Sequence, residues 1–242
     1  MNRPMLHELK RVREGVAPPF ATATNPGTPG THKPAPGAGL VPAHLPYHQR
    51  SEQIRLLRTE LLLRHDAGDR ANILAVVSAH PGEGRSQLAA EVAISFAQLR
   101  QPTLLVDADL RAPSQHALFG ADNRSGLAGA LARESRPVLQ TVAGLPALSL
   151  LTAGPLPPNP LELLSDRCFE DAVAHWCSTF QFVVIDTPPI ARYADALAVA
   201  TVTGRVLTLC RATRTAFRDT RDMTRRLAAT RARTLGAVIN RF

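Results

Sequence analysis

The residues with the clearest chemical potential lie in the stretch ILAVVSAHPGEGRS, residues 73–86. A short apolar run is followed by a glycine-rich loop and by the start of a helix, an arrangement that holds phosphates with backbone N–H groups and a helix N-terminus. Against the consensus G-x-x-x-x-G-K-[ST], Ala79 replaces the first glycine and Arg85 replaces the lysine. The expected nucleotide-binding residues are Pro81, Gly82, Glu83, Gly84, Arg85, Ser86 and Gln87.

Three aspartates follow apolar runs elsewhere in the chain and could complete this site. Asp107 and Asp109 end the run TLLVDAD, and Asp186 ends the run FVVID. Because Mg²⁺ prefers a few oxygen ligands together with water and phosphate, we expect Ser86, Asp107 and Asp186 to hold it. Asp107 or Asp109 could orient or deprotonate a hydroxyl in phosphoryl transfer. A single such aspartate could equally be a helix cap, but three beside one phosphate loop favour catalysis.

Arg85 is the departure from the consensus that bears most on the chemistry. An arginine keeps the positive charge of the usual lysine, but it is longer and planar and needs more space. We count Arg85 among the catalytic residues and predict that nucleotide binding is retained or weakened while phosphoryl transfer is reduced.

Buried strands and intervening helices must position these groups. Near-continuous Val/Ile/Leu runs separated by helical segments predict an α/β fold with a mostly parallel sheet covered by helices on both faces. Ligands bind at the carboxyl ends of such strands. The expected strands are 73–78, 103–107, 148–151, 182–186, 206–210 and 235–239, and the expected helices are 51–65, 84–99, 125–133, 160–165, 168–179, 195–201 and 215–229.

The N-terminal 46 residues differ from the remainder in composition. They contain nine of the 20 prolines and five of the 15 glycines, without apolar periodicity. Such a segment cannot bury enough surface to offset its ordering entropy, so we expect a disordered tail over 1–46 and one domain over 47–242. In the first helix of that domain, Ser51 is the expected N-cap.

Positive charge is concentrated near the end of the sequence. The net charge is +8, and residues 205–242 contain ten arginines against two aspartates. A spacing of three and four places Arg211, Arg214, Arg218, Arg221 and Arg225 on one predicted helix face. This face could contact anionic lipid or an acidic partner, or it could simply be solvated. Nucleic acid is not an expected partner, because no aromatic residues interleave with the arginines.

The sequence also bears on location in the cell. Three cysteines without a C-x-x-C pair and without a signal peptide fit reduced thiols in the cytoplasm. No apolar run approaches the roughly 18 residues that a membrane-spanning helix needs. We therefore expect a cytoplasmic protein that meets the inner face of the plasma membrane only peripherally.

Taken in order, several motifs resemble those of the bacterial tyrosine kinases (BY-kinases) of capsule and exopolysaccharide synthesis, which are P-loop NTPases. The resemblance spans residues 47–242. SAHPGEGRS is similar to the Walker A motif of that family, LLVDADLRAP to its Walker A′ motif, and FVVIDTPP to its Walker B motif. AGPLPPNPLELL and the final strand LGAVINRF also resemble family segments. SEQIRLLR matches the E-x-x-R-x-x-R helix through Glu52, Arg55 and Arg58.

The resemblance implies an ATP- and Mg²⁺-dependent kinase of protein tyrosine. It also implies ring assembly through Glu52, Arg55 and Arg58, and an adenine close to Asn240. A separate transmembrane polysaccharide co-polymerase, or chain-length determinant, is the implied partner. The tyrosine-rich tail of the family is not found in this sequence, which contains only Tyr47 and Tyr193.

Two other functions stay open at this point. One is a catalytically impaired pseudokinase that acts as a scaffold for the co-polymerase, because Arg85 and the lack of a tyrosine cluster both weaken the kinase interpretation. The other is a partitioning-type ATPase of the same fold. Such ATPases carry an additional lysine directly after the first glycine position of the loop, where this sequence has His80.

Overall fold

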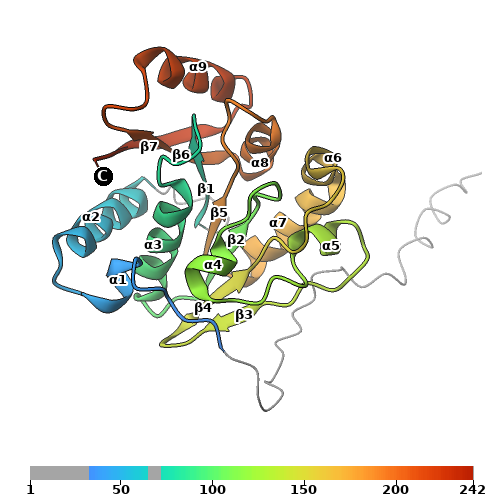
Figure 1. The fold of residues 1–242 in the computed structure, drawn as a ribbon, viewed down its shortest axis with the longest axis horizontal. Helices are drawn as coiled ribbons and strands as arrows, with labels where there is room; N and C mark the ends of the chain where they lie inside the picture. Colours follow the sequence, from blue (N-terminus) through green and yellow to red (C-terminus); the bar gives the residue numbers. More distant parts are fainter. Residues whose placement is uncertain (1–32, 65–71, 242) are drawn as a thin grey trace, which may run out of the picture.

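A seven-stranded sheet forms the centre of the protein, which we describe from a computed structural model over residues 33–64 and 72–241 (Figure 1). The strand order is β3-β4-β2-β5-β1-β6-β7. Neighbouring strands are parallel except for the antiparallel pair β3–β4 at one edge. The strands are β1 (Asn72–Ser78), β2 (Thr103–Asp107), β3 (Gln140–Val142), β4 (Leu145–Leu151), β5 (Phe182–Asp186), β6 (Arg205–Arg211) and β7 (Arg233–Asn240). The predicted mostly parallel sheet is confirmed.

Helices cover both faces of this sheet, as Figure 1 shows. The described helices are α1 (Val41–His44), α2 (Gln49–Leu63), α3 (Arg85–Ala97), α4 (Gln115–Phe119), α5 (Leu127–Leu131), α6 (Pro160–Ser165), α7 (Arg167–Thr179), α8 (Asp195–Thr203) and α9 (Phe217–Ala228). One apolar cluster joins the sheet to α1–α4, and Phe96 stacks on Phe182 there at 4.2 Å. The second cluster joins the opposite face to α5–α9 and includes Trp176. The site is therefore supported by a core on each side of the sheet.

The central strands β2 and β5 are buried along their whole length. This burial explains why both read as unbroken apolar runs rather than as alternating patterns. Their parallel register places Asp107 directly opposite Asp186. The fold therefore brings together two carboxylates that are almost 80 residues apart in the sequence.

The predicted tail boundary at residue 46 is wrong for the part of the tail that the structure describes. Residues 33–46 include α1 and pack on the domain: the N–H groups of Ala35 and Gly37 donate to the carbonyls of Phe119 and Leu118, both at 2.8 Å. Leu40 is completely buried in the apolar cluster beneath α1–α4. Residues 1–32 of the predicted tail lie outside the described residues.

Several helix ends differ from the prediction. The N-cap of α2 is His48, whose Nδ1 accepts from the N–H of Arg50, whereas Ser51 lies inside the helix and donates to the Leu45 carbonyl. Helix α9 begins only at Phe217, so Arg211 belongs to β6 and Arg214 precedes the helix. The short elements α1, α4 and β3 were not predicted. Over the two described ranges, we find no helix with the length and apolarity needed to span a bilayer.

Candidate functional site

The glycine-rich loop connects β1 to α3. Gly82 and Gly84 have φ values of +75° and +94°, in the left-handed region that favours glycine. Ala79 is not among the described residues with positive φ, so the alanine at the first glycine position causes no backbone strain. The two glycines that the loop geometry requires are therefore present, and α3 begins directly after the second.

The outward side of the loop is tied to the C-terminal part of the domain. The Glu83 carboxylate accepts from the N–H of His80 at 2.9 Å and from the hydroxyl of Thr215. Asn240 Nδ2 donates to the Glu83 carbonyl at 2.9 Å. Glu83, predicted to bind nucleotide, thus uses its side chain to brace the loop. Asn240 lies at the loop, at the end of β7.

Two more contacts reach the same side of the loop, one from the last residue of β6 and one from α9. Arg211 Nη1 donates to the Gly82 carbonyl at 3.0 Å. His80 Nε2 lies 3.0 Å from Asp219 Oδ2 of α9, and the hydrogen bond from His80 lowers the pKa of Asp219. We call these four links, His80–Asp219, Glu83–Thr215, Gly82–Arg211 and Glu83–Asn240, the outer contacts.

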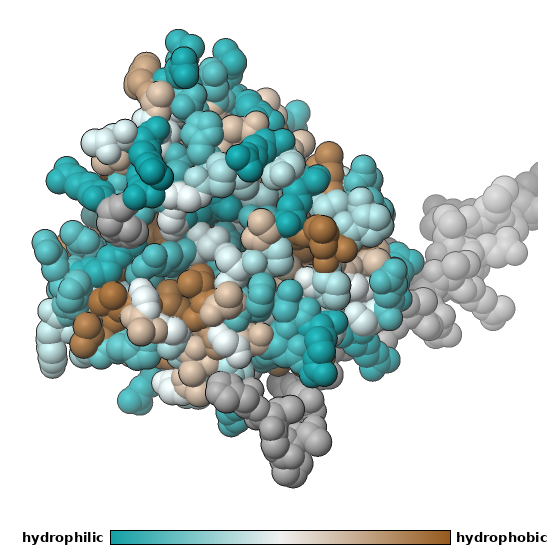
Figure 2. Space-filling view, in the orientation of Figure 1, coloured by the Kyte–Doolittle hydropathy of each residue, from teal (hydrophilic) through white to brown (hydrophobic). Residues whose placement is uncertain are grey.

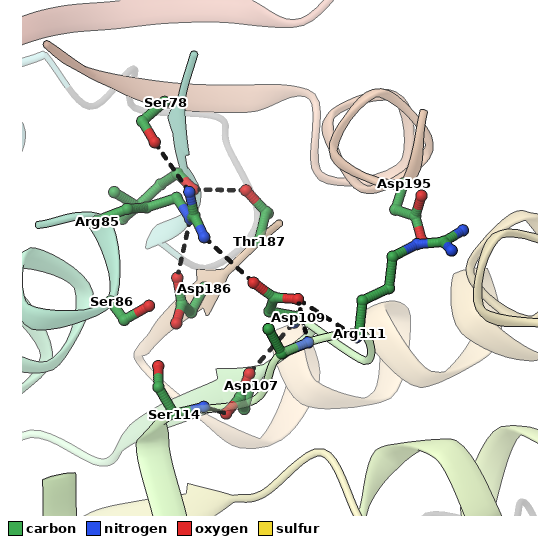
Figure 3. A network of polar contacts seen from close by, with 12 residues as sticks. Ser78, Arg85, Ser86, Asp107, Asp109, Arg111, Ser114, Asp186, Thr187 and Asp195 are labelled. Atoms are coloured by element: carbon green, nitrogen blue, oxygen red, sulfur yellow. Dashed lines mark hydrogen bonds and ion pairs between the residues drawn. The ribbon is translucent and has the colours of Figure 1, made fainter. Parts of the chain in front are cut away.

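The inward side of the loop faces the three predicted carboxylates, all buried. We call Asp107, Asp109 and Asp186 the acidic cluster (Figure 3). Asp107 Oδ2 accepts from the N–H groups of Ser114 and Gln115, at 3.0 and 2.9 Å, and its Oδ1 accepts from the N–H of Asp109 at 3.2 Å. Asp107 therefore holds the turn that leads into α4, and fewer of its lone pairs are available to a metal ion.

Burial controls the protonation of this cluster. Loss of hydration raises the pKa of Asp107 well above its usual range, and the neighbouring Asp186 raises it further. Burial also raises the pKa of Asp186, while the charge of Arg85 and hydrogen bonds from Ser86 and Gln115 oppose that rise. Asp107 and Asp186 thus bind protons more tightly than exposed aspartates do.

Arg85 extends into the acidic cluster, as Figure 3 shows. Its Nη1 donates to Ser78 Oγ at 2.8 Å and its Nη2 to Asp109 Oδ2 at 3.2 Å. Its Nε lies 3.4 Å from Asp186 Oδ1. Each guanidinium nitrogen thus faces a different residue, and the side chain is only 7% exposed. The structure brings Arg85 together with two of the predicted acids.

Gln115 is a site residue that the sequence reasoning missed. It is fully buried at the start of α4, and its Nε2 donates to the Ser86 carbonyl at 3.0 Å and to Asp186 Oδ2 at 2.8 Å. Its Oε1 has no hydrogen-bond partner within the described ranges. The available signal was a polar residue at the start of a short apolar helix, eight residues after Asp107.

Arg111 forms a second link at this edge of the sheet. Its Nε donates to Asp195 Oδ1 at 3.0 Å, and its guanidinium lies 4.3 Å from the centre of the Tyr193 ring. Asp195 is the first residue of α8 and is fully buried. The Walker A′ segment is thereby connected to the loop that follows β5.

The residues present fit a magnesium ion that is shared with a nucleotide. In the described part of the chain, no three His, Cys, Asp or Glu side chains form a metal cage. Mg²⁺ does not require one, because it is usually held by one or two carboxylates together with water and phosphate oxygens. Asp186 Oδ1 is buried without a hydrogen-bond donor among the described residues, and the Ser86 hydroxyl lies beside the same carboxyl group (Figure 3). Ser86 and Asp186 are thus the better-placed members of the predicted set.

The residues predicted to mediate ring assembly lie away from the loop, on α2. Glu52 and Arg55 form an ion pair one helical turn apart. Arg58 instead turns toward α3, where its Nη1 donates to the Ser95 carbonyl at 2.7 Å. Glu52 is exposed, whereas Arg55 and Arg58 are both half-buried, and Arg55 also donates to the Pro46 carbonyl.

Comparison with known proteins gives the family. No protein-family profile matches the chain. It is 34% identical to the tyrosine-protein kinase YwqD of Bacillus subtilis over 196 residues. This match covers 81% of this chain and 82% of YwqD. It is 31% identical to the putative tyrosine-protein kinase CapB of Staphylococcus aureus, over 79% of this chain and 84% of CapB.

Solved structures agree with these relatives. The kinase domain of the Escherichia coli tyrosine kinase ETK superposes with a TM-score of 0.80 at 28% identity, covering 89% of this chain and 84% of that domain. With the glycine loop and the three strand-end aspartates in place, these similarities show that the chain belongs to the family of bacterial tyrosine-protein kinases.

Proposed function

We propose that the chain binds ATP with Mg²⁺ and transfers a phosphoryl group to protein tyrosine. The observation that carries this proposal is the acidic cluster. Its three carboxylates are buried, and neighbouring strands place them on the inward side of a glycine-rich phosphate loop. Family membership and the names of the relatives support the same activity.

Each part of the site has a distinct task in this proposal. The N–H groups of residues 82–87 bind the phosphates, and Asn240 lies on the adenine side. Ser86 and Asp186 hold Mg²⁺, which neutralises charge on the transferred phosphoryl group. Asp109 or Asp107 accepts the proton of the attacking tyrosine hydroxyl. Arg85 contributes positive charge on the phosphate side.

The test is transfer of radiolabelled phosphate from ATP to a tyrosine-containing copolymer, with nucleotide affinity measured in parallel by fluorescent ADP. Wild type should label the copolymer, and Asp109→Asn should lose most of that labelling while still binding ADP. Binding of ADP without any labelling, even with the cytosolic segment of a membrane partner present, would contradict the kinase proposal.

A catalytically impaired scaffold is the second candidate, and the position of Arg85 favours it. A guanidinium engaged by Asp109 and Asp186 is less available to a phosphate than a lysine would be. The Arg85→Lys variant separates the two candidates: a large gain in turnover indicates a natural impairment, whereas equal turnover in both proteins argues against one. A partitioning-type ATPase is not proposed, because the family assignment favours the kinases.

The process that we propose is regulation of capsule or exopolysaccharide polymerisation and export, in the cytoplasm beside a transmembrane co-polymerase. Support comes from the family resemblance and from the exposed Glu52 on α2, which carries the half-buried Arg55 as its ion-pair partner and suits a homo-oligomeric ring. Pulldown with the cytosolic segment of a chain-length determinant protein tests the partner. Light scattering of wild type and Arg55→Ala tests the ring, and an unchanged mass would argue against this use of α2.

Helix α9 supports an additional peripheral contact with anionic membrane. The side chains of Arg218, Arg221 and Arg225 are 81%, 65% and 74% exposed, and the Phe217 ring beside them is also exposed. The end of the molecule formed by α9 is mainly hydrophilic (Figure 2). Substituting glutamate for Arg214, Arg218 and Arg221 should abolish flotation with anionic vesicles, and unchanged flotation would exclude this surface.

A further inference from the structure

Arg85 joins the ends of three neighbouring strands. Its partner Ser78 ends β1, Asp186 ends β5, and Asp109 follows β2, and these strands are adjacent in the order β2-β5-β1. A lysine ammonium has a single nitrogen, whereas the guanidinium presents three nitrogens in a planar fork. The arginine at this position therefore meets each of its three partners with a different nitrogen, whereas a lysine would have to make every contact from a single nitrogen.

Negative charge on the acidic cluster favours a cation beside it. Asp107, Asp109 and Asp186 are each at most 3% exposed, and uncompensated buried charge is strongly destabilising. The Arg85 guanidinium contacts two of the three carboxylates, including the buried Asp186 Oδ1, for which no donor is found within the described ranges. This is the oxygen that best suits a divalent cation, so a metal ion and the guanidinium would require the same atom.

We propose that Arg85 is the resident counter-cation of the acidic cluster, and that a divalent cation binds this cluster only when the guanidinium leaves it. Nucleotide phosphates offer Arg85 new oxygen partners and thereby free the carboxylates, so divalent cation and nucleotide bind in a coupled manner. This inference rests on the proposed function in one respect. It takes the acidic cluster to be the part of a nucleotide site that binds the metal ion.

Manganese is a suitable probe because free and bound Mn²⁺ are distinguished by electron paramagnetic resonance. Without nucleotide, wild type should bind Mn²⁺ weakly. Arg85→Ala should bind it at least about tenfold more tightly, because a full positive charge has been removed from beside the carboxylates. In the same variant, Mn²⁺ should raise the melting temperature, whereas it should leave that of wild type unchanged.

A matched control separates this effect from the general loss of a buried ion pair. Arg50 Nη2 lies 2.6 Å from Glu91 Oε2, and the Glu91 side chain is fully buried between α2 and α3. Arg50→Ala should therefore lower the melting temperature, but Mn²⁺ should not restore it. Restoration in both variants would indicate nonspecific binding and would overturn the proposal.

A second variant keeps the test decisive if Arg85→Ala folds poorly. Arg85→Lys retains the charge with one nitrogen, so its Mn²⁺ affinity without nucleotide should lie between those of wild type and Arg85→Ala. Nucleotide-free wild type that binds Mn²⁺ as tightly as either variant would overturn the inference. Fluorescent ADP binding is measured on the same samples: its absence would contradict the proposed function, whereas the Mn²⁺ comparison judges the role of Arg85.

Discussion

The contacts on the two sides of the phosphate loop differ in their exposure to solvent. On the inward side, Arg85 and the acidic cluster form contacts that are almost entirely removed from water. On the outward side, His80 and Asp219 form a link whose side chains are 41% and 25% exposed. Solvent screens exposed ion pairs, whereas loss of one partner in a buried set leaves a charge without compensation. Loss of an inward contact should therefore cost more stability than loss of the His80–Asp219 link on the outward side.

The largest expected effect is that of Asp186→Ala, which removes the partner of Arg85 Nε and of Gln115 Nε2. Breaking a buried charge pair should lower the free energy of unfolding by about 3–5 kcal/mol. Urea unfolding measures this loss. Asp222→Ala is the exposed control, because Asp222 is paired with Arg225 at the surface and should matter little. A loss below about 1 kcal/mol for Asp186→Ala would contradict the contrast between the two sides.

Gln115→Leu should have the next largest effect. It removes a buried amide and leaves the Ser86 carbonyl and Asp186 Oδ2 without their donor, at a cost of about 1–3 kcal/mol. Gln98→Leu is the matched control, since Gln98 is exposed and water can replace its bond to the Pro42 carbonyl. Equal losses in urea unfolding for the two variants would indicate that Gln115 has no special place in the site.

Arg211→Ala tests the outward side through nucleotide binding. The bond from Arg211 to the Gly82 carbonyl should contribute about 0.5–1.5 kcal/mol, so the affinity for fluorescent ADP should fall roughly two- to tenfold. Hydrogen exchange of residues 80–84 should accelerate while the melting temperature changes little. Arg214→Ala, an exposed neighbour, serves as the control, and slower exchange in Arg211→Ala would refute the role of this contact.

The smallest expected effect concerns Asp219, whose pKa is lowered by the hydrogen bond from His80. A carboxyl group with a lowered folded-state pKa stabilises the fold above its unfolded pKa and loses that contribution as the pH falls through the folded value. Wild type should therefore melt slightly above Asp219→Asn at neutral pH, and the margin should shrink below about pH 4. High salt should shrink it as well. A difference in melting temperature between the two proteins that grows on acidification would contradict the expected direction of this effect.

Local patterns in the sequence predicted the loop, the main strands and the three aspartates. Unbroken apolar runs and glycine spacing carry those features, because they depend on neighbouring residues. The direction of the Arg85 side chain and the role of Gln115 could not be predicted, since both depend on contacts between separate strands and helices. The packing of residues 33–46 was missed for a similar reason. Their composition argues for disorder, but Leu40 fills a position in a core formed by distant residues.

The bond from Asn240 to Glu83 has a consequence for the order in which the protein becomes competent. The two residues are 157 positions apart, so the loop receives this brace only after β7 has joined β6. During synthesis, chains fold from the N-terminus onward, and contacts between distant positions form late. The brace on the glycine loop therefore cannot form until almost the whole domain has been translated, because Asn240 is the last residue of β7.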